Sequence, residues 1–343
     1  MEGDPTPFVE LMEYMIPVET DRREVMRWCA TLIARPDVRM RYSLLLISEI
    51  QGVGKTTLGQ DILVPLVGPH NASFPSEQMI IDSIFNSWIA HKRLAVVHEI
   101  YSGDSKKGYN RLKDKIADTG VTVNKKHLEP YDVENYLHAV ACSNSVRAIH
   151  LDDADRRWLV PRVVEKLRDK KTWDAFHHWL RGDGLGIIRG YLEKLAEQPG
   201  FVVGTGDHAP LTSMKQEIIN ESRSTGQQLA YDLGIAAMKV QDKFKVVLTV
   251  EEVRRWVAEK RRIDMNDPKL EKHRTLKRVL MAAGMKEPKT APEETRKRYN
   301  VDVGEREHDK VMTYVMANFE IAEGLEWDAV KEHHWLPKDI WPL

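Results

Sequence analysis

Three features that would assign this chain to a specialised class are scarce or absent. Only two cysteines, Cys29 and Cys142, occur in 343 residues, and they fit neither a zinc-ligand spacing nor a disulfide framework. No run approaches the roughly 20 apolar residues of a membrane-spanning helix. The N-terminus carries Glu2 and Asp4 and lacks an apolar signal core. The sequence therefore predicts a protein of the reducing cytoplasm with no membrane partner.

An excess of charge of one sign is also missing. The 51 lysines and arginines are balanced by 52 aspartates and glutamates, for a formal net charge of −1. Overall charge thus gives no indication of a nucleic-acid partner, and any basic surface must be local. With 42% hydrophobic residues, the chain should form an ordinary core, and its length suits one large α/β domain with a smaller one.

Apolar residues follow two different periodicities along the first half of the chain. Helical spacing covers about residues 5–36 and is expected again over 77–91. Between and after these stretches, short apolar runs of strand length occupy 42–48, 94–97 and 137–141. Strands that alternate with helices predict an α/β fold with a mostly parallel sheet, covered on both faces.

The second half of the chain contains a segment with a local excess of basic residues. From residue 239 to residue 300 the sequence holds 18 lysines and arginines against 10 aspartates and glutamates. Helices are expected over 250–262 and 269–283, followed by a strand pair around 297–303 and 310–315, an order that suits a winged-helix-like unit. The expected organisation is an N-terminal helical segment (1–40), an α/β core (41–200), a connection (201–238) and a basic C-terminal domain (239–343).

The most informative motif is a glycine-containing loop between the expected strand at 42–48 and a helix that starts near Lys55. Such a loop turns successive backbone N–H groups toward a triphosphate, and the helix N-terminus adds its dipole. Lys55 would reach the β- and γ-phosphates, and the Thr56 hydroxyl would hold Mg²⁺. Glu49 stands where the strict pattern has its first glycine. A strand–helix turn that merely uses Gly-x-Gly is the alternative, but strand, loop and helix coincide here. The predicted ATP-binding residues are Gln51, Gly52, Val53, Gly54, Lys55, Thr56 and Thr57.

Polar residues follow the next two expected strands. Glu99 comes after 94–97 and is expected to polarise the attacking water and, with Thr56, to bind Mg²⁺. His98 takes the place of the more usual aspartate. Asn144 follows the strand at 137–141 and could orient water beside the γ-phosphate, or could equally be a turn residue.

Arg156 and Arg157 follow Asp152, Asp153 and Asp155. In a ring ATPase, an arginine at such a place reaches into the neighbouring subunit's site and stabilises the charge of the transition state. Local pairing with the adjacent aspartates is the alternative. The sequence does not decide which arginine would be the finger.

The motifs QGVGKTT, RLAVVHE, HAVACSNS and DRRWLV, in this order over roughly 110 residues, resemble superfamily 3 helicases. The similarity is to the helicase part of phage and plasmid primase-helicases and virulence-associated E-like proteins, and it is weak over the first 40 and last 140 residues. The resemblance implies a P-loop AAA+-type core, a hexameric ring, ATP and Mg²⁺ as cofactors, and single-stranded nucleic acid pulled through a central pore.

The resemblance also implies a hairpin that carries basic residues into the pore. Here a strand-like run over 121–123 ends in a polar turn with Lys125, Lys126 and His127. Positive charge at such a tip would follow phosphates without reading bases. An inert surface loop is the alternative.

Three functions remain open at this stage. The favoured one is an ATP-dependent ring helicase that unwinds DNA during replication of a phage, plasmid or other mobile element, in a bacterial or phage-infected cell. Its expected partners are single-stranded DNA or a forked duplex and a primase or polymerase. The second is a nucleic-acid-stimulated ATPase switch or remodeller, for example in anti-phage defence. The third is an origin-binding scaffold that does not hydrolyse ATP.

Overall fold

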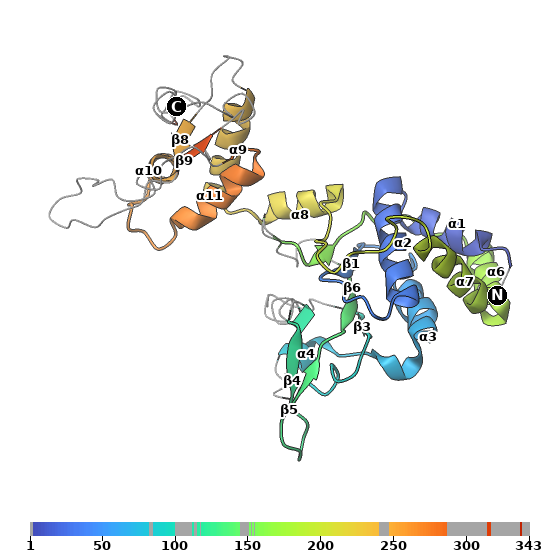
Figure 1. Ribbon diagram of the computed structural model, residues 1–343. Helices are drawn as coiled ribbons and strands as arrows, with labels where there is room; N and C mark the ends of the chain where they lie inside the picture. The colour runs from blue at the N-terminus through green and yellow to red at the C-terminus, as the bar shows by residue number, and fades with distance from the viewer. Residues whose placement is uncertain are drawn as a thin grey trace. The chain divides into compact units, whose positions relative to one another are not determined.

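The computed structural model divides the chain into two compact units (Figure 1). Unit 1 comprises Met1–Leu151 and Asp155–Ser222, and unit 2 comprises Asp152–Ala154 and Arg223–Leu343. The residues that the structure describes are 3–81, 85–99, 112, 115–116, 118–144, 151, 153, 155–239, 247–286, 314–316 and 337.

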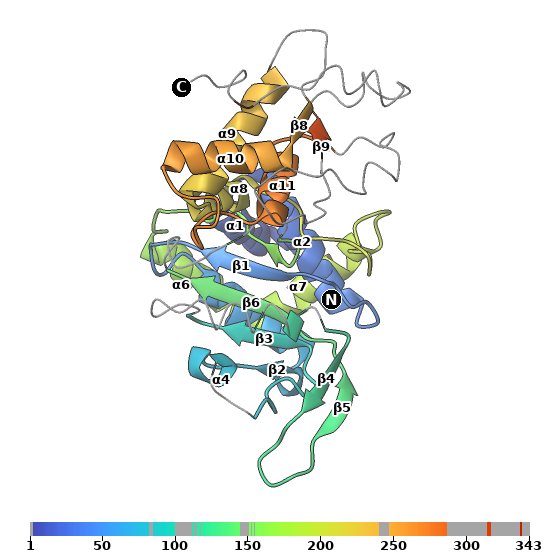
Figure 2. The same cartoon turned by 90° about the vertical axis from the view of Figure 1, so that its left-hand side faces the viewer.

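A five-stranded sheet in which every neighbouring pair is parallel forms the core of unit 1 (Figure 2). This confirms the predicted parallel sheet, and the three expected strands are β1, β3 and β6. Two further strands, β2 and β7, have only two residues each, too few to show a periodicity. In the order β2-β3-β6-β1-β7, the strands span Ala72–Ser73, Leu94–Val97, His138–Ser143, Ser43–Ile47 and Trp158–Leu159.

The sheet is buried on both faces because alternate side chains of each strand enter different apolar clusters. In β1, Leu44 and Leu46 pack into one cluster, whereas Leu45 and Ile47 pack into the other. All five β1 residues are consequently buried, which explains why this strand reads as a continuous apolar run. The predicted covering of both faces is confirmed.

Helices on one side of this sheet pack around the cluster that contains Leu44 and Leu46 (Figure 1). The expected helical stretch 5–36 is two helices, because Pro17 lacks a backbone N–H and forces Ile16 out of the helical region (φ −126°, ψ 83°). In the described part of the chain no helix is both long and apolar enough to cross a membrane. The helices of unit 1 are α1 (Thr6–Met15), α2 (Glu19–Ala34), the π-helical segment Thr57–Leu63 with α3 (Val64–Val67), the short 3-10 helix Pro69–Asn71, α4 (Glu77–Ile81), α6 (Lys170–Trp179), the π-helical segment Leu180–Gly184 with α7 (Leu185–Ala196), and α8 (Ser213–Ser222).

The helix expected over 77–91 was predicted too long. Residues 85–91 form turns rather than helix, and His91 has a positive φ of 57°. Asn86 instead bonds to the segment that includes β4: its amide donates to the Thr122 carbonyl oxygen, and its Oδ1 accepts from the Asn124 N–H. These long-range hydrogen bonds hold the backbone where local spacing favoured a helix.

An antiparallel hairpin separate from the main sheet follows in the chain (Figure 2). It consists of β4 (Gly120–Val123) and β5 (Tyr131–Glu134), with Val121 opposite Val133. Val121 and Val123 are buried while the alternate residues of β4 are exposed, so the hairpin has one apolar and one polar face.

The described residues of unit 2 form three helices and a two-stranded antiparallel sheet. The two expected helices are present, and α10 begins with a capping box formed by Thr249 and Glu252. The expected strand at 297–303 lies outside the described residues. The segment 201–238, expected to be a connection, contains α8 and all but the last residue of α9. The elements are α9 (Thr225–Lys239), β8 (Val247–Thr249), α10 (Val250–Arg261), α11 (His273–Ala282) and β9 (Tyr314–Met316), with β8 paired to β9.

A fully buried histidine makes the stability of unit 1 depend on pH. His138 Nε2 accepts a hydrogen bond from the Met40 N–H at 3.0 Å. Burial, followed by repulsion from Arg93, lowers the pKa of His138 from 6.5 to about 3. Below pH 6.5 the unfolded chain therefore binds a proton that the folded chain excludes. We expect the free energy of unfolding to fall as pH drops from 6.5 toward 3, by about 1.4 kcal/mol per unit from this residue.

Urea unfolding at pH 7 and pH 5 measures this effect. His138→Gln is the control, because a glutamine oxygen can still accept from the Met40 N–H but does not titrate. The unaltered chain should lose about 2 kcal/mol more than the variant between these pH values. Equal losses would show that His138 is not the titrating group.

Candidate active site

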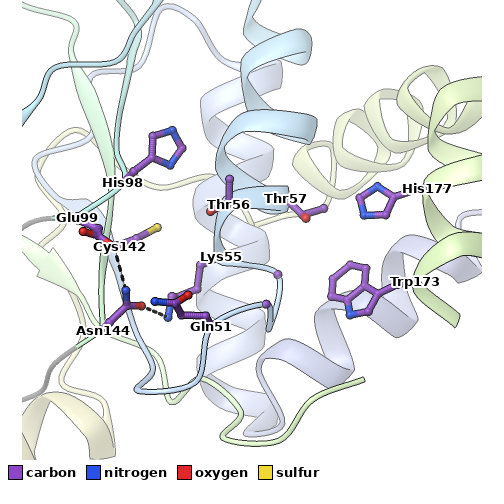
Figure 3. A pocket seen from close by; sticks show the side chains of 12 residues that line it. Gln51, Lys55, Thr56, Thr57, His98, Glu99, Cys142, Asn144, Trp173 and His177 are labelled. Carbon is purple, nitrogen blue, oxygen red and sulfur yellow. Dashed lines mark hydrogen bonds between the residues drawn. The ribbon is translucent and has the colours of Figure 1, made fainter. Parts of the chain in front are cut away.

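A pocket of about 520 Å³ opens where strands β1, β3 and β6 end (Figure 3). The carboxyl edge of a parallel sheet is where ligands bind in open α/β folds. The pocket gathers most of the predicted site residues with two aromatic residues that the sequence did not indicate. Its lining consists of Gln51, Gly52, Gly54, Lys55, Thr56, Thr57, His98, Glu99, Cys142, Asn144, Trp173 and His177.

The predicted phosphate loop follows β1 and ends in the helix that begins at Lys55. Gly52 (φ +79°) and Gly54 (φ +106°) adopt backbone conformations that residues with a side chain rarely reach. Lys55 and Thr56 form the first helical turn, so the helix N-terminus faces the pocket. Val53 is buried and, unlike its predicted neighbours, is not among the described lining residues.

Glu165 holds the start of the loop, where Glu49 stands at the position of the first glycine in the strict pattern. The Glu165 carboxylate accepts hydrogen bonds from the Glu49 N–H and the Ile50 N–H, both at 3.1 Å, and from the Ser48 hydroxyl at 3.0 Å. The carboxylate satisfies these donors from outside the loop. Glu49 itself has no positive φ, so the backbone at this position does not require a glycine. Glu165 lies 116 residues from Glu49 in the chain, and no sequence motif indicates it.

The Lys55 ammonium is buried at the base of the loop, with 6% of the residue exposed. It donates to the Ser48 carbonyl oxygen at 2.7 Å and to Asn144 Oδ1 at 3.0 Å. Desolvation lowers the pKa of Lys55, while the nearby carboxylates of Glu165 and Glu99 act in the opposite direction. A cation held in this way is positioned to bind phosphate oxygens.

Asn144 connects Lys55 to Glu99 (Figure 3). Its side-chain nitrogen donates to Glu99 Oε1 at 3.2 Å while its oxygen accepts from Lys55. The strand order explains this bridge, because β6 lies between β1, which precedes the loop, and β3, which precedes Glu99. An ammonium, an amide and a carboxylate thus form one polar chain along the edge of the sheet.

Thr56 and Glu99 are the oxygen-bearing residues predicted to hold Mg²⁺, and both line the pocket. His98 lines it as well and stacks on Phe74, with ring centroids 6.0 Å apart and an interplanar angle of 3°. Cys142 is buried, and burial raises the pKa of its thiol to about 12. Cys142 is therefore a neutral thiol at neutral pH.

Trp173 and His177 form the opposite side of the pocket (Figure 3). They lie four residues apart on α6 and so share one face of that helix. Their rings stack with centroids 5.5 Å apart and an interplanar angle of 23°. The i, i+4 spacing could have suggested a common face, but nothing in the sequence connects α6 with the phosphate loop.

Neither Arg156 nor Arg157 is among the described residues that line this pocket. Arg156 is exposed, and its guanidinium lies 3.3 Å from His208 Nε2. Arg157 is half-buried. The arginines precede β7, the strand at one end of the sheet order.

The neighbouring aspartates have partners of their own. The buried Asp155 carboxylate accepts from the backbone N–H groups of Arg157 and Trp158 and lies 3.6 Å from the Lys215 ammonium. Asp153 forms a 2.5 Å ion pair with Arg223 within unit 2. Asp152 lies outside the described residues. Lys215 and Arg223 are thus cations beside these two carboxylates.

Lys125, Lys126 and His127 are exposed in the turn that joins β4 to β5. His127 has a left-handed backbone (φ 64°), which reverses the chain at this point. Leu128 follows and is 60% exposed. The structure thus places the predicted basic residues at a hairpin tip, away from the described pocket.

Comparison with known proteins finds matches over part of the chain, and the matched part includes most of this site. Residues 46–157 match a family of unknown function, DUF5906. A DNA primase-polymerase of Nitratiruptor phage NrS-1 is 28% identical over 186 residues, which are 52% of this chain and 25% of that protein. The chain therefore spans about a quarter of the length of this curated relative.

Solved structures show a similar fold over nearly the whole chain. The A form apo structure of the NrS-1 C-terminal region has a TM-score of 0.56 at 16% identity and covers 92% of this chain and 76% of that one. A second apo structure of the same region has a TM-score of 0.57 at 16% identity, with 93% and 77% covered.

Proposed function

We propose that this chain is an ATP-driven DNA translocase of the superfamily 3 helicase type that acts in phage DNA replication. The observation that carries the proposal is the polar chain of Lys55, Asn144 and Glu99 in one pocket beside the phosphate loop. Lys55 would bind the β- and γ-phosphates, Asn144 would sense the γ-phosphate, and Glu99 would activate water. Thr56, with Glu99, would hold Mg²⁺.

The sheet order supports an AAA+-type arrangement of this site. It places the Asn144 strand between the phosphate-loop strand and the Glu99 strand, so that one amide contacts both the phosphate-binding cation and the water-activating carboxylate. The hydrogen bonds of Asn144 would then differ between the state with the γ-phosphate and the state without it. This coupling between hydrolysis and conformation is what a motor needs.

DNA as the substrate is supported by the phage relative, which is described as a DNA primase-polymerase. We propose single-stranded or forked DNA as the track, self-assembly into a hexameric ring, a primase or polymerase as the partner, and the interior of an infected cell as the location. The alternatives are a nucleic-acid-stimulated switch and a scaffold that does not hydrolyse ATP. A buried lysine and a carboxylate joined through one amide favour hydrolysis over the scaffold.

Strand displacement tests the proposal most directly. We expect ATP hydrolysis that is stimulated by single-stranded DNA, together with release of a labelled strand from a forked duplex when ATP and Mg²⁺ are present. Stimulated hydrolysis without strand release on any fork would favour the switch. Absence of hydrolysis with every nucleic acid would favour the scaffold and contradict the proposal.

The hairpin tip is expected to contact the DNA backbone. In Lys125→Ala/Lys126→Ala, we expect single-stranded DNA binding to weaken about tenfold and to lose part of its salt dependence, because two phosphate contacts are removed. ATP hydrolysis without DNA should stay unchanged, because both residues lie outside the described pocket. Fluorescence anisotropy at several salt concentrations measures the effect.

Two further variants separate charge from shape at this tip. Lys125→Arg/Lys126→Arg keeps the charge and should bind DNA nearly as well as the unaltered chain. Glu129→Ala alters the same exposed turn without removing a cation and should not weaken binding. Unchanged affinity and salt dependence in the double alanine variant would show that the tip is not a DNA contact.

Unit 2 is proposed to be a winged-helix-like module. The order α9, β8, α10, α11 and β9, with β8 paired to β9, supports this. Exposed Lys272, Arg274 and Arg278 lie on or beside α11 and give it a basic surface. A wing needs a further strand beside the β8–β9 pair. An experimental structure in which no third strand joins this pair would contradict a wing.

A further inference from the structure

We infer that Trp173 and His177 form a base-binding shelf for the nucleotide whose phosphates occupy the loop. This inference rests on the proposed ATP site and names the part of it that receives the base. The two rings and the Lys55–Asn144–Glu99 chain lie on opposite sides of the same pocket, with Thr56 and Thr57 between them (Figure 3). When the phosphates of a nucleotide lie at Lys55, its base lies farther away from that residue. The shelf is a surface of the pocket suited to bind this base.

The shelf is built against the phosphate loop itself. A Cβ added at Gly54, the residue directly before Lys55, would lie 3.1 Å from the indole ring of Trp173. Met15 and Leu11 of α1 would lie 3.5 and 3.6 Å from the same point. The missing side chain at Gly54 therefore lets the indole reach the loop, and the shelf begins where the phosphate site ends.

Surrounding aromatic groups hold Trp173 in place. Tyr14 contacts it edge to face, with centroids 6.3 Å apart at 88°, and Phe176 does so at 6.1 Å and 81°. The guanidinium of Arg168 lies 5.9 Å from the centre of the Trp173 ring and 5.3 Å from that of Tyr14. A half-buried indole fixed in this way loses little side-chain entropy when a base packs on the shelf.

The chemistry of the shelf predicts which nucleotides it accepts. Aromatic side chains bind the π-face that every base presents, and this contact is sequence-tolerant. Helix α6 contributes an indole and an imidazole to the described pocket. Among the described lining residues it contributes no carboxylate or carboxamide, the groups that would form hydrogen bonds with the edge of a purine. We therefore expect ATP and GTP to bind with affinities within about tenfold of each other, because stacking dominates over edge recognition.

Binding measurements with and without a base isolate the shelf. Isothermal titration calorimetry on the full chain in Mg²⁺ would compare ATP and GTP with inorganic tripolyphosphate, which has no base. Trp173→Leu and His177→Ala should each weaken ATP and GTP by about tenfold, in the range of a lost base–aromatic contact. The affinity for tripolyphosphate should not change, because Lys55 and the loop remain.

Matched variants distinguish stacking from packing. Trp173→Phe keeps an aromatic face and should recover most of the ATP affinity that Trp173→Leu loses. His178→Ala alters the adjacent, exposed histidine of α6, which is not among the described lining residues, and should leave both ligands unaffected. Circular dichroism establishes that each variant is folded.

Two results would overturn the shelf while leaving the proposed ATPase in place. One is unchanged affinity for ATP and GTP in Trp173→Leu and His177→Ala. The other is equal weakening of ATP and tripolyphosphate, which would mean that Trp173 only supports the loop at Gly54. By contrast, failure of the unaltered chain to bind either ATP or tripolyphosphate would overturn the proposed function, and the shelf with it.

Discussion

Lys55→Ala should lower ATP hydrolysis by about 100- to 1000-fold, which is the scale of losing one preorganised group that stabilises transition-state charge. The reason lies in the position of this ammonium: it is buried at the base of the loop and held by the Ser48 carbonyl oxygen and Asn144. Water cannot replace a fixed cation at that place. Steady-state phosphate release at saturating ATP and Mg²⁺ measures the loss. Lys171→Ala, an exposed lysine on α6, is the matched control and should hydrolyse ATP normally.

Glu99→Gln provides the contrast that separates binding from chemistry. The glutamine keeps the shape of Glu99 and can still accept from Asn144, but it lacks the charge that activates water. This variant should bind ATP as well as the unaltered chain and hydrolyse it at least tenfold more slowly.

Wild-type turnover in Lys55→Ala would disprove the phosphate-loop assignment. Weak ATP binding by Glu99→Gln, with normal turnover of the bound ATP, would contradict the role of Glu99.

Mixing two inactive variants should restore part of the ATPase activity if the arginines act on a neighbouring subunit. Arg156→Ala/Arg157→Ala and Lys55→Ala should each be nearly inactive alone, because an arginine finger contributes about 10³- to 10⁵-fold to turnover. In a mixed ring, some interfaces combine an intact Lys55 with intact arginines from the adjacent chain. Phosphate release should rise with the fraction of such interfaces as the mixing ratio varies.

Pairing within the same subunit is the alternative to this role. Arg156 lies 3.3 Å from His208 Nε2, while Asp155 lies 3.6 Å from the Lys215 ammonium and Asp153 pairs with Arg223. Arg156→Ala and Arg157→Ala tested singly would identify the finger. If mixed oligomers form, as shown by differently tagged subunits, and activity is not restored, the arginines act within their own subunit or only support the fold.

The sequence by itself determined the local features of unit 1. Strands β1, β3 and β6 are recognisable because both faces of the sheet are buried, which makes each strand a continuous apolar run. The predicted phosphate loop is recognisable because its glycines and Lys55 are neighbours in the chain. The hairpin with Lys125 and Lys126 was implied by the resemblance to superfamily 3 helicases, together with a strand-like run that ends in polar residues.

The tertiary structure alone decided how these parts meet. The strand order places Asn144 between Lys55 and Glu99, and no local pattern encodes the order of strands in a sheet. Glu165 binds the start of the loop from 116 residues away in the chain. Trp173 reaches Gly54 from a helix whose own sequence resembles an ordinary amphipathic surface. Periodicity and motif spacing report only on neighbours along the chain, whereas these contacts depend on packing between distant segments.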